Sequence, residues 1–420
     1  DVKAYVNDNT RQSNITIDAQ QISVKGNKLE NMLVNIYSPG DTLRYSAKTH
    51  KRSKDGEVMA FGISGKAAGN ILLAALEWKN ESEGGGFQGS LNTRSRFYRN
   101  KEGKDVAHVS ISPSEVMIGD SLWHIRPANV VYASDYLKVD DFLLQHEAQH
   151  ISIDGLATKD SSDSLNVGLQ DVNVAYILDF VNFRSVEFDG FASGDVVVKS
   201  LFSDVQASAR LDVSEFRFEK GRMGTLTVFA DWDNENGQVN LRAQCADDNV
   251  IPMGYFLTEQ GSAHGNTMQH DGRTLIDGYI SAKRNYIDLD IRAHNTRAEF
   301  MESFCSSFMD NVNVWANGRA RLWGDLKKIN LTGSVVANGT VFITPLNTSY
   351  TLRNDTVNFL PEDIQFAQCT IYDQYGGRGV VNGALHHKNL GRMTFDIDVE
   401  ADNMLCYDFP MQNGSTFGGH

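Results

Sequence analysis

Apolar and polar residues alternate over long stretches of this chain. From Ile329 to Ile343, one set of alternate positions is apolar or small and the intervening set is mostly polar. A period of two is typical of a β-strand with one buried face and one solvated face. The apolar set comprises Ile329, Leu331, Gly333, Val335, Ala337, Gly339, Val341 and Ile343. The pattern predicts a long strand whose apolar side must be covered by something, and what covers it bears on function.

The same alternation recurs along the chain and predicts a protein made mainly of strands. Asn236-Gly237 lies between two such runs and predicts a hairpin, while Gly84-Gly85-Gly86 and Asp271-Gly272 mark other turns. Ile71–Trp78 is almost continuously apolar, so it fits a buried strand or a short helix. The alternating runs are Ile15–Ala19, Leu33–Ile36, Leu43–Ala47, Val106–Ile111, Ile151–Ile153, Leu165–Leu169, Ala209–Val213, Leu226–Trp232, Val239–Cys245, Ile276–Ala282, Ile287–Ala293 and Met393–Ala401.

Two segments carry helical spacing instead. Apolar residues from Phe300 to Phe308 recur every three to four positions, which predicts a helix near 296–308 with Thr296 as its cap. A second helix is predicted near 174–183. Each is expected to pack on the sheet as a plug or end cap. The two segments align as an internal repeat, and a third partial copy begins at Phe395 and reaches Met404 and Leu405.

Length and composition narrow the class of protein. A chain of 420 residues is expected to form roughly two to four domains. The formal net charge of −14 argues against nucleic-acid binding and against electrostatic docking on an anionic membrane. The basic residues Lys48, Lys51, Arg52 and Lys54 are followed by Asp55 and Glu57, which predicts a solvated hairpin loop.

The four cysteines form no closely spaced pair, so neither a zinc ribbon nor a dense disulfide framework is expected. Cys245 continues the apolar positions of its strand, which predicts a buried free thiol, and the sequence leaves open whether other cysteines pair. No stretch approaches the roughly 18 apolar residues of a membrane-spanning helix. The chain starts at Asp1 without a signal peptide, and we expect the natural protein to continue at both ends.

One motif competes with a structural interpretation. His146-Glu147-Ala148-Gln149-His150 matches the HExxH pattern of zinc proteases, which requires a helix and a third ligand. Here the motif runs into the alternating segment Ile151–Ile153, and in an extended strand the two histidines would lie about 13 Å apart on one face. Asp231, Asp233 and Glu235 lack the glycine of a calcium loop. We therefore expect no metal site, no cofactor and no catalytic residues.

From Ile329 to Pro410 the chain resembles the C-terminal conserved region of the TamB family of envelope proteins, within the AsmA-like group. The order and spacing of several blocks carry this resemblance. Residues 1–290 share the general strand-rich pattern of the family more than its motifs. The blocks are Leu331–Val335, Phe342–Tyr350, Asn358–Pro361, Ile371–Gly377, Gly383–His387 and Phe395–Leu405.

The resemblance implies an all-β fold, an elongated twisted β-taco: a U-shaped sheet with an apolar concave face and a few short helices. It implies a periplasmic segment of a bridge-type carrier that moves phospholipid between inner and outer membranes, and it brings no catalytic residues. The implied partners are phospholipid acyl chains, a TamA-like outer-membrane barrel and the inner membrane, reached through a missing N-terminal anchor. We divide the chain into an N-terminal β-taco segment at 1–139, a middle segment at 140–293 and a TamB-like segment at 294–420.

The apolar side of the strands is the expected lipid-groove lining. Alternation alone does not distinguish such a groove from a dry core, although the small residues Gly333, Ala337 and Gly339 favour open space. A scaffold for outer-membrane proteins that pairs an exposed sheet edge with client strands is the alternative function, and a zinc hydrolase built on His146 and His150 is a third hypothesis. The predicted lining residues are Leu211, Val213, Leu226, Val228, Val239, Leu241, Leu289, Ile291, Ile329, Leu331, Val335, Val341, Ile343, Phe395, Ile397 and Val399.

Overall fold

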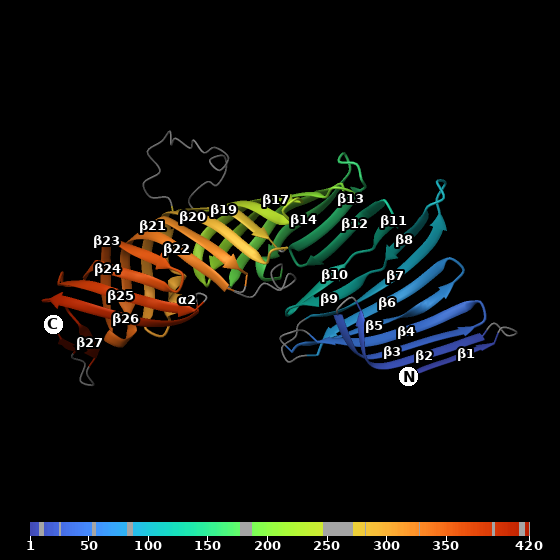
Figure 1. Ribbon diagram of the computed structural model, residues 1–420, viewed down its shortest axis with the longest axis horizontal. Coiled ribbons are helices and arrows are strands. Elements are labelled where there is room, and N and C mark those ends of the chain that lie inside the picture. Colours follow the sequence, from blue (N-terminus) through green and yellow to red (C-terminus); the bar gives the residue numbers. More distant parts are fainter. Residues whose placement is uncertain are drawn as a thin grey trace. The chain divides into compact units, whose positions relative to one another are not determined.

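The all-β prediction is confirmed in the computed structural model. It describes residues 1–7, 12–24, 27–52, 56–81, 87–176, 187–246, 272–281, 283–326, 328–388, 391–410 and 416–419. Strands account for 78% of the described residues and helices for 3%, and 26 of the described strands belong to one antiparallel sheet. The chain divides into two compact units (Figure 1). Unit 1 comprises Asp1–Val172 and Asp195–Ala207, and unit 2 comprises Asn173–Gly194 and Ser208–His420. The three-segment division stays a prediction.

The strands follow one another along the chain. The first fourteen lie in unit 1: β1 (Val2–Asn7), β2 (Gln12–Val24), β3 (Asn27–Pro39), β4 (Thr42–Arg52), β5 (Val58–Ala68), β6 (Ile71–Asn80), β7 (Gln88–Arg99), β8 (Asp105–Ile111), β9 (Ser114–Ile118), β10 (Ser121–Ile125), β11 (Ala128–Ala133), β12 (Tyr136–His146), β13 (Gln149–Ala157) and β14 (Ser164–Asn173).

Unit 2 holds most of the remaining elements, and β15 is shared between the units. These elements are β15 (Phe188–Lys199), β16 (Gln206–Phe218), β17 (Gly221–Asp233), β18 (Gln238–Ala246), β19 (Arg273–Ser281), β20 (Tyr286–Arg297), α2 (Met301–Cys305), β21 (Met309–Asp325), β22 (Lys328–Ile343), the 3₁₀ turn η1 (Thr344–Leu346), β23 (Thr348–Leu360), β24 (Asp363–Tyr372), β25 (Arg378–Lys388), β26 (Gly391–Asp402), β27 (Tyr407–Pro410) and β28 (Thr416–Gly419).

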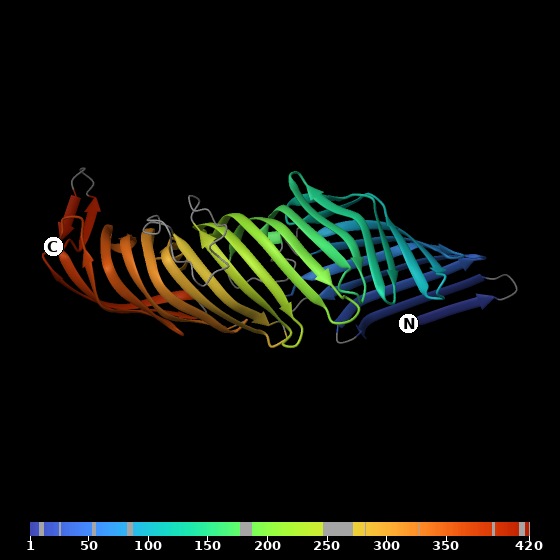
Figure 2. The same cartoon turned by 90° about the horizontal axis from the view of Figure 1, so that it is seen from above.

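Most strands lie beside their neighbours in the sequence (Figures 1 and 2), although in unit 1 β11 pairs with β8. Every strand from β16 to β26 pairs antiparallel with the next. In unit 1, β8 and β9 both pair with β7, and β10 and β11 both pair with β12. The breaks fall at Pro113 and Pro127, since proline has no N–H to donate to a strand ladder.

Bulges and glycines bend the strands. Asn295, at φ 49°, lies in a register shift of β20, and Gln368, at φ 55°, lies in one of β24. Gly318 has φ +153°, and a Cβ there would lie 2.4 Å from the carbonyl oxygen of Ser334 on the neighbouring strand. Only glycine allows that close approach of two backbones.

Every alternating run that the sequence indicated lies in a strand over its described residues, and Ala282, the end of one run, lies outside them. Ile71–Trp78 is part of strand β6, and Asn236-Gly237 lies in the turn between β17 and β18, so the hairpin is confirmed. The turn signal Gly84-Gly85-Gly86 and Asp271 lie outside the described residues. In the part of the chain that the structure describes, no helix has the length and hydropathy needed to span a membrane.

Two predictions about local structure were wrong. The helix predicted near 296–308 is limited to Met301–Cys305, and Thr296 does not cap it because Thr296 belongs to β20. Lys48, Lys51 and Arg52 lie in β4 rather than in a hairpin loop, while Lys54 lies outside the described residues. Of the helix predicted near 174–183, residues 177–183 also lie outside them.

Candidate functional site

The strand register joins the predicted lining residues across unit 2. Directly opposite residues of antiparallel strands share a face of the sheet. Row 1 runs Val213, Leu226, Cys245, Thr274, Ala293, Gly318, Val335, Val357, Phe366, Gly383 and Ile397. Row 2 runs Leu211, Val228, Ala243, Ile276, Ile291, Ala320, Gly333, Phe359, Ile364, Leu385 and Phe395.

Two shorter rows continue the same side. Row 3 runs Ala209, Ala230, Leu241, Gly278, Leu289, Leu322 and Leu331, and row 4 runs Trp232, Val239, Ile280, Ile287, Gly324 and Ile329. Val341, Ile343 and Val399 lie at alternate positions from row 1 members of their strands, so they belong to this side too. The structure therefore brings all sixteen predicted residues to one side of the sheet.

The other side of the sheet carries polar and charged residues at the positions between these rows. Arg321 forms an ion pair with Asp288 at 2.8 Å, and Arg292 pairs with Asp277. The guanidinium of Arg321 lowers the pKa of Asp288 through their hydrogen bond. One polar row there runs Asp212, Thr227, Gln244, Leu275, Arg292, Arg319, Ser334, Asn358, Gln365, Ala384 and Asp396.

Most of the predicted lining residues are half-buried. Val213 is more deeply buried than the others, with 5% of its surface exposed. Phe395 and Val399 on β26 are more accessible, at 58% and 47% exposed. A side chain inside a dry core would be almost completely buried, so most of these residues have neighbours along the sheet but retain accessible surface.

The segment between β20 and β21 packs on this side of the sheet. Cys305 and Phe308 belong to a core cluster with Val357, Ile364 and Leu385. The predicted lining residues Val335, Val341 and Ile397 pack against the same cluster. Burial raises the pKa of the Cys305 thiol to about 11. The expectation that this segment is a plug packed on the sheet is confirmed.

The same segment also reaches β16 and β17. The ring of Phe218 lies 5.3 Å from that of Phe300 and 6.2 Å from that of Phe304, between centroids. A Cβ on Gly221 would lie 2.3 Å from the backbone nitrogen of Phe300, so the two chains are in close contact. The helix α2 thus touches β17, the second strand of the row system, and β26, its last strand.

Two further segments pack on this side. After β26 the chain folds back, and Met404 joins a cluster with Leu352 and Ile371. The Tyr350 hydroxyl donates to the carbonyl oxygens of Leu405 and Cys406, at 3.1 and 3.2 Å. Burial raises the pKa of Tyr350 to about 12.

At the other end, Val174 packs against a cluster that contains Val213 and Cys245. Cys245 forms no disulfide and is 2% exposed, which confirms the predicted buried thiol. The other three cysteines form no disulfide either. The three segments that the sequence aligned as an internal repeat therefore each supply, in the residues described, side chains that pack on the same side of the sheet.

Of the small residues of β22, Ala337 does not face open space, whereas Gly333 is exposed. Ala337 is 6% exposed within the core cluster. A Cβ on Gly333 would lie 2.3 Å from the carbonyl oxygen of Arg319, and one on Gly339 would lie 2.1 Å from that of Asn313. These positions are small because the neighbouring backbone is close.

Unit 1 has rows of its own that we did not name from the sequence. One row runs Val2, Ile17, Val34, Ala47, Ile63, Leu76 and Leu91, and a second runs Ala4, Ile15, Ile36, Tyr45, Gly65, Ala74, Thr93, Ile111 and Ala128. The alternating runs Ile15–Ala19, Leu33–Ile36 and Leu43–Ala47 contained the signal, so these residues could have been identified with the others.

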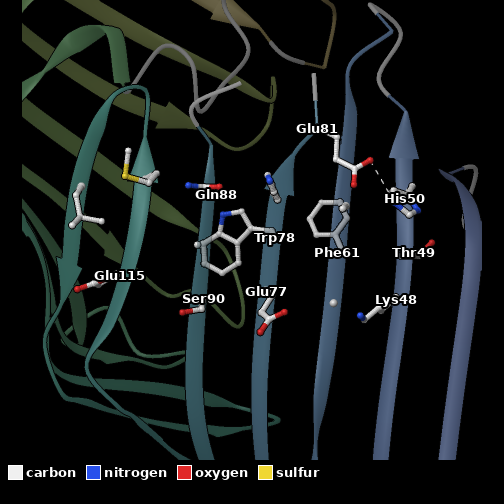
Figure 3. A pocket seen from close by; sticks show the side chains of 16 residues that line it. Lys48, Thr49, His50, Phe61, Glu77, Trp78, Glu81, Gln88, Ser90 and Glu115 are labelled. Atoms are coloured by element: carbon white, nitrogen blue, oxygen red, sulfur yellow. Dashed lines mark ion pairs between the residues drawn. The ribbon is translucent and has the colours of Figure 1, made fainter. Parts of the chain in front are cut away.

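A cavity of about 670 Å³ lies on β4–β7 and the β9–β10 hairpin (Figure 3). Lys48, Gly62, Glu77 and Ser90 are direct cross-strand partners that alternate with the Ala47–Ile63 row. The cavity is also lined by Phe61, Trp78 and Gly89, which are cross-strand partners at the row's own parity. Basic and acidic side chains are mixed there, and His50 pairs with Glu81 at 3.5 Å. The mixture favours neither an anionic nor a cationic ligand.

The HExxH motif forms a hairpin rather than a helix or a single strand. His146 ends β12, Glu147 turns the chain at φ 50°, and His146 and His150 pair with Gln149 and Gln145, respectively. Because neighbouring positions alternate, the two histidines lie on opposite faces, which corrects the expectation of a shared face. Nδ1 of His146 lies 2.8 Å from the carbonyl oxygen of Leu122. No group of three metal-ligating side chains occurs within the described ranges.

The calcium-like run is likewise structural. The carboxylate of Asp233 accepts hydrogen bonds from the backbone and side-chain nitrogens of Asn236, at 3.0 and 2.7 Å, and these bonds lower its pKa. Asp233 therefore stabilises the turn of the predicted hairpin.

No protein-family model, curated protein or solved structure matches this chain.

Proposed function

We propose that this chain is a segment of a TamB-like, bridge-type lipid carrier, in which the side of the sheet that carries rows 1–4 is a groove for phospholipid acyl chains. The observation that carries the proposal is the continuity of these rows across successive strands, from Val213 and Leu211 on β16 to Ile397 and Phe395 on β26. A catalytic pocket needs only a few convergent residues, whereas a conduit needs an apolar lining that continues from strand to strand.

The contacts of α2 support a U-shaped sheet in unit 2. Strands are spaced about 4.8 Å apart, so a flat sheet would place β17 and β26 about 43 Å from each other. The five residues of α2 extend only about 7.5 Å. A helix of that length can contact both strands only if the sheet curls around it, with the row-bearing side on the inside.

A groove of this kind suits lipid transfer energetically. Each methylene buried away from water contributes roughly 0.8 kcal/mol. A lining of Leu, Val and Ile side chains can replace the interior of a bilayer without polar specificity. The periplasmic location, the tether to the inner membrane, the TamA-like partner and the absence of catalysis rest on the family resemblance and are part of the same proposal.

Lipid bound to the purified protein tests the proposal. Native mass spectrometry and solvent extraction are expected to show co-purifying phospholipid. Leu331→Asp in row 3 places a charge in the groove and should greatly reduce the lipid bound. Ser334→Asp is the matched control, because Ser334 lies exposed on the other side of the same strand. A lipid-free protein, or equal loss in both variants, would contradict a groove.

The alternative function, a scaffold that pairs strands with outer-membrane proteins, is favoured by the edge of the sheet at β26. In the described part of the chain, β26 pairs with β25 only, and Phe395 and Val399 are exposed. Such an edge can accept an additional strand. A photoreactive residue at position 399 distinguishes the two functions, because a scaffold gives crosslinks to client proteins and a conduit gives crosslinks to lipid.

A further inference from the structure

We infer that the segment from Ala298 to Phe308, which contains α2, is a gate that occupies the groove and is displaced by the acyl chains that pass along it. This inference rests on the proposed function and adds a regulatory element to the same site. It follows from where the segment packs, from what holds it there, and from how its two ends are attached.

The segment and an acyl chain would compete for the same surface. The core cluster that contains Cys305 of α2 and Phe308 also contains Val357 of row 1 and Ile364 and Leu385 of row 2, and Val335 and Ile397 of row 1 pack against it. A lipid tail that follows either row from β20 toward β25 must reach these residues. In this conformation Cys305 and Phe308 cover them, with exposed fractions of 0% and 8%. Passage along rows 1 and 2 therefore requires the segment to move.

Mainly hydrocarbon contacts hold α2 in place. Phe300 and Phe304 pack on Phe218, and the ring of Phe308 lies 5.0 Å from that of Phe395. An acyl chain offers the same kind of contact, so it can replace the segment at little cost in free energy. A helix of five residues without a side-chain cap is not stable by itself, and it depends on this packing.

The polar ties of α2 are few and partly exposed. The Ser303 hydroxyl donates to the Glu219 carbonyl oxygen, and the Arg222 backbone N–H donates to the Glu299 carboxylate at 3.3 Å. The Val312 backbone N–H donates to the Glu302 carboxylate, also at 3.3 Å. Water can replace each of these partners once the segment is lifted.

Both ends of the segment are attached to strands. The Ala298 N–H donates to the carbonyl oxygen of Val314 at 2.9 Å, and the Thr344 N–H donates to that of Phe308 at 3.0 Å. The β21–β22 ladder begins at Met309, directly after the segment. The segment can therefore move as a strap between fixed ends without opening the sheet.

The native cysteines report this motion. Cys305 lies in α2, whereas Cys369 is 1% exposed and belongs to a different cluster, the one around Tyr350 and Met404. The unmodified protein is treated with a maleimide, with and without dihexanoylphosphatidylcholine below its micelle concentration. Labelled positions are mapped by peptide mass spectrometry, and bound lipid is measured in the same samples by native mass spectrometry. A gate predicts that labelling of Cys305 rises several-fold with bound lipid while labelling of Cys369 stays constant.

The other outcomes separate the two proposals. Bound lipid with unchanged labelling of Cys305 overturns the gate and leaves the groove intact. Absence of bound lipid overturns the groove and the gate together. An equal rise at Cys305 and Cys369 shows general loosening and also overturns a local gate.

A variant pair gives an independent test. Phe304→Ala removes an aromatic contact of α2, so lipid-free protein should label faster at Cys305, and lipid transfer between vesicles should speed up. Phe342→Ala is the control, since Phe342 lies on the other side of β22 and is also half-buried. Circular dichroism checks that both variants fold. Slower transfer in Phe304→Ala alone would mean that α2 lines the groove rather than closing it, and would overturn the inference.

Discussion

Strands β1–β5 and strands β21–β25 share the same alternation but differ in burial. In the described residues of β1–β5 no side chain is buried, and Leu43, Phe61 and Ile63 are 37%, 38% and 36% exposed. In β21–β25 the corresponding side of the sheet holds Val314, Val357 and Leu385 below 9% exposure. The strands are alike, so the difference must come from what packs on them.

Inserted segments account for the buried region. The segment around Cys305 and the turn at Met404 pack on β21–β25, and neither belongs to a strand. No comparable helix or fold-back occurs between β1 and β5 in the residues described. Alternation thus determines which side of a sheet is apolar, and the connections between strands determine whether that side is filled.

The largest effect is expected from truncating a buried row residue. Leu385→Ala should lower the free energy of unfolding of unit 2 by about 2–5 kcal/mol, since the surroundings of a fully packed side chain relax only partly. Ile63→Ala, its counterpart in β5, should cost about 1 kcal/mol or less because Ile63 is already accessible. Urea unfolding followed by circular dichroism measures both. If Ile63→Ala lowered the free energy of unfolding as much as Leu385→Ala, the row-bearing side of β5 would also have to be covered by packed side chains.

A second contrast concerns the backbone. Gly318→Ala places a Cβ 2.4 Å from the Ser334 carbonyl oxygen at a φ of +153°, so it should cost about 1–3 kcal/mol. Gly62→Ala in unit 1 is the matched control, where a Cβ would lie 3.8 Å from its nearest neighbour, an ordinary contact. Thermal unfolding compares the two. If the two variants unfolded at the same midpoint, the close approach of the neighbouring backbone would not explain why position 318 is glycine.

Alternation predicted the strands and the side that their apolar residues share. It could do so because the other side of the sheet is solvated, so polar residues occupy every second position. It failed where the period is broken. At Thr296 a bulge with Asn295 at φ 49° shifts the register, so the residue stays in β20 and cannot cap a helix. A bulge of this kind leaves no mark in the spacing of apolar residues.

Other misses concern turns and packing. The hairpin at Glu147-Ala148 lacks the glycine and asparagine that signal tight turns. The sequence pattern therefore placed His146 and His150 in one continuous strand. Gly339 suggested open space because the sequence shows that a side chain is absent but does not show that the backbone of Asn313 lies close by. The covering of Val335 by α2 depends on contacts between distant strands, which no local pattern encodes.

A smaller effect should come from the fold-back at the end of unit 2. Burial alone would raise the pKa of Asp373, but hydrogen bonds from the backbone N–H groups of Leu405, Tyr375 and Gly377 outweigh it and lower the pKa. The carboxylate therefore stabilises the folded state fully above the unfolded pKa, near about 4, and this contribution is lost as the pH falls through the lowered folded pKa.

Asp373→Asn should accordingly lower the unfolding midpoint at neutral pH and bring it close to that of the unmodified protein in acid. Thermal scans between about pH 3 and pH 7 measure the difference. Asp402→Asn, at an exposed position on β26, should leave the pH profile unchanged. A gap between Asp373→Asn and the unmodified protein that persists undiminished in acid would show that the carboxylate charge does not hold the fold-back.

The smallest change in stability is expected for Phe61→Thr in β5. The ring is 38% exposed and threonine favours strands, so the free energy of unfolding should change by about 1 kcal/mol or less. Binding of an apolar fluorescent dye should nevertheless fall, because the variant removes accessible aromatic surface from the open side of unit 1. Phe342→Thr, on the polar side of β22, should leave dye binding unchanged. If dye binding fell equally in both variants, the dye would not bind to the row-bearing side of β1–β5. The proposed difference in accessible apolar surface between β1–β5 and β21–β25 would then be contradicted.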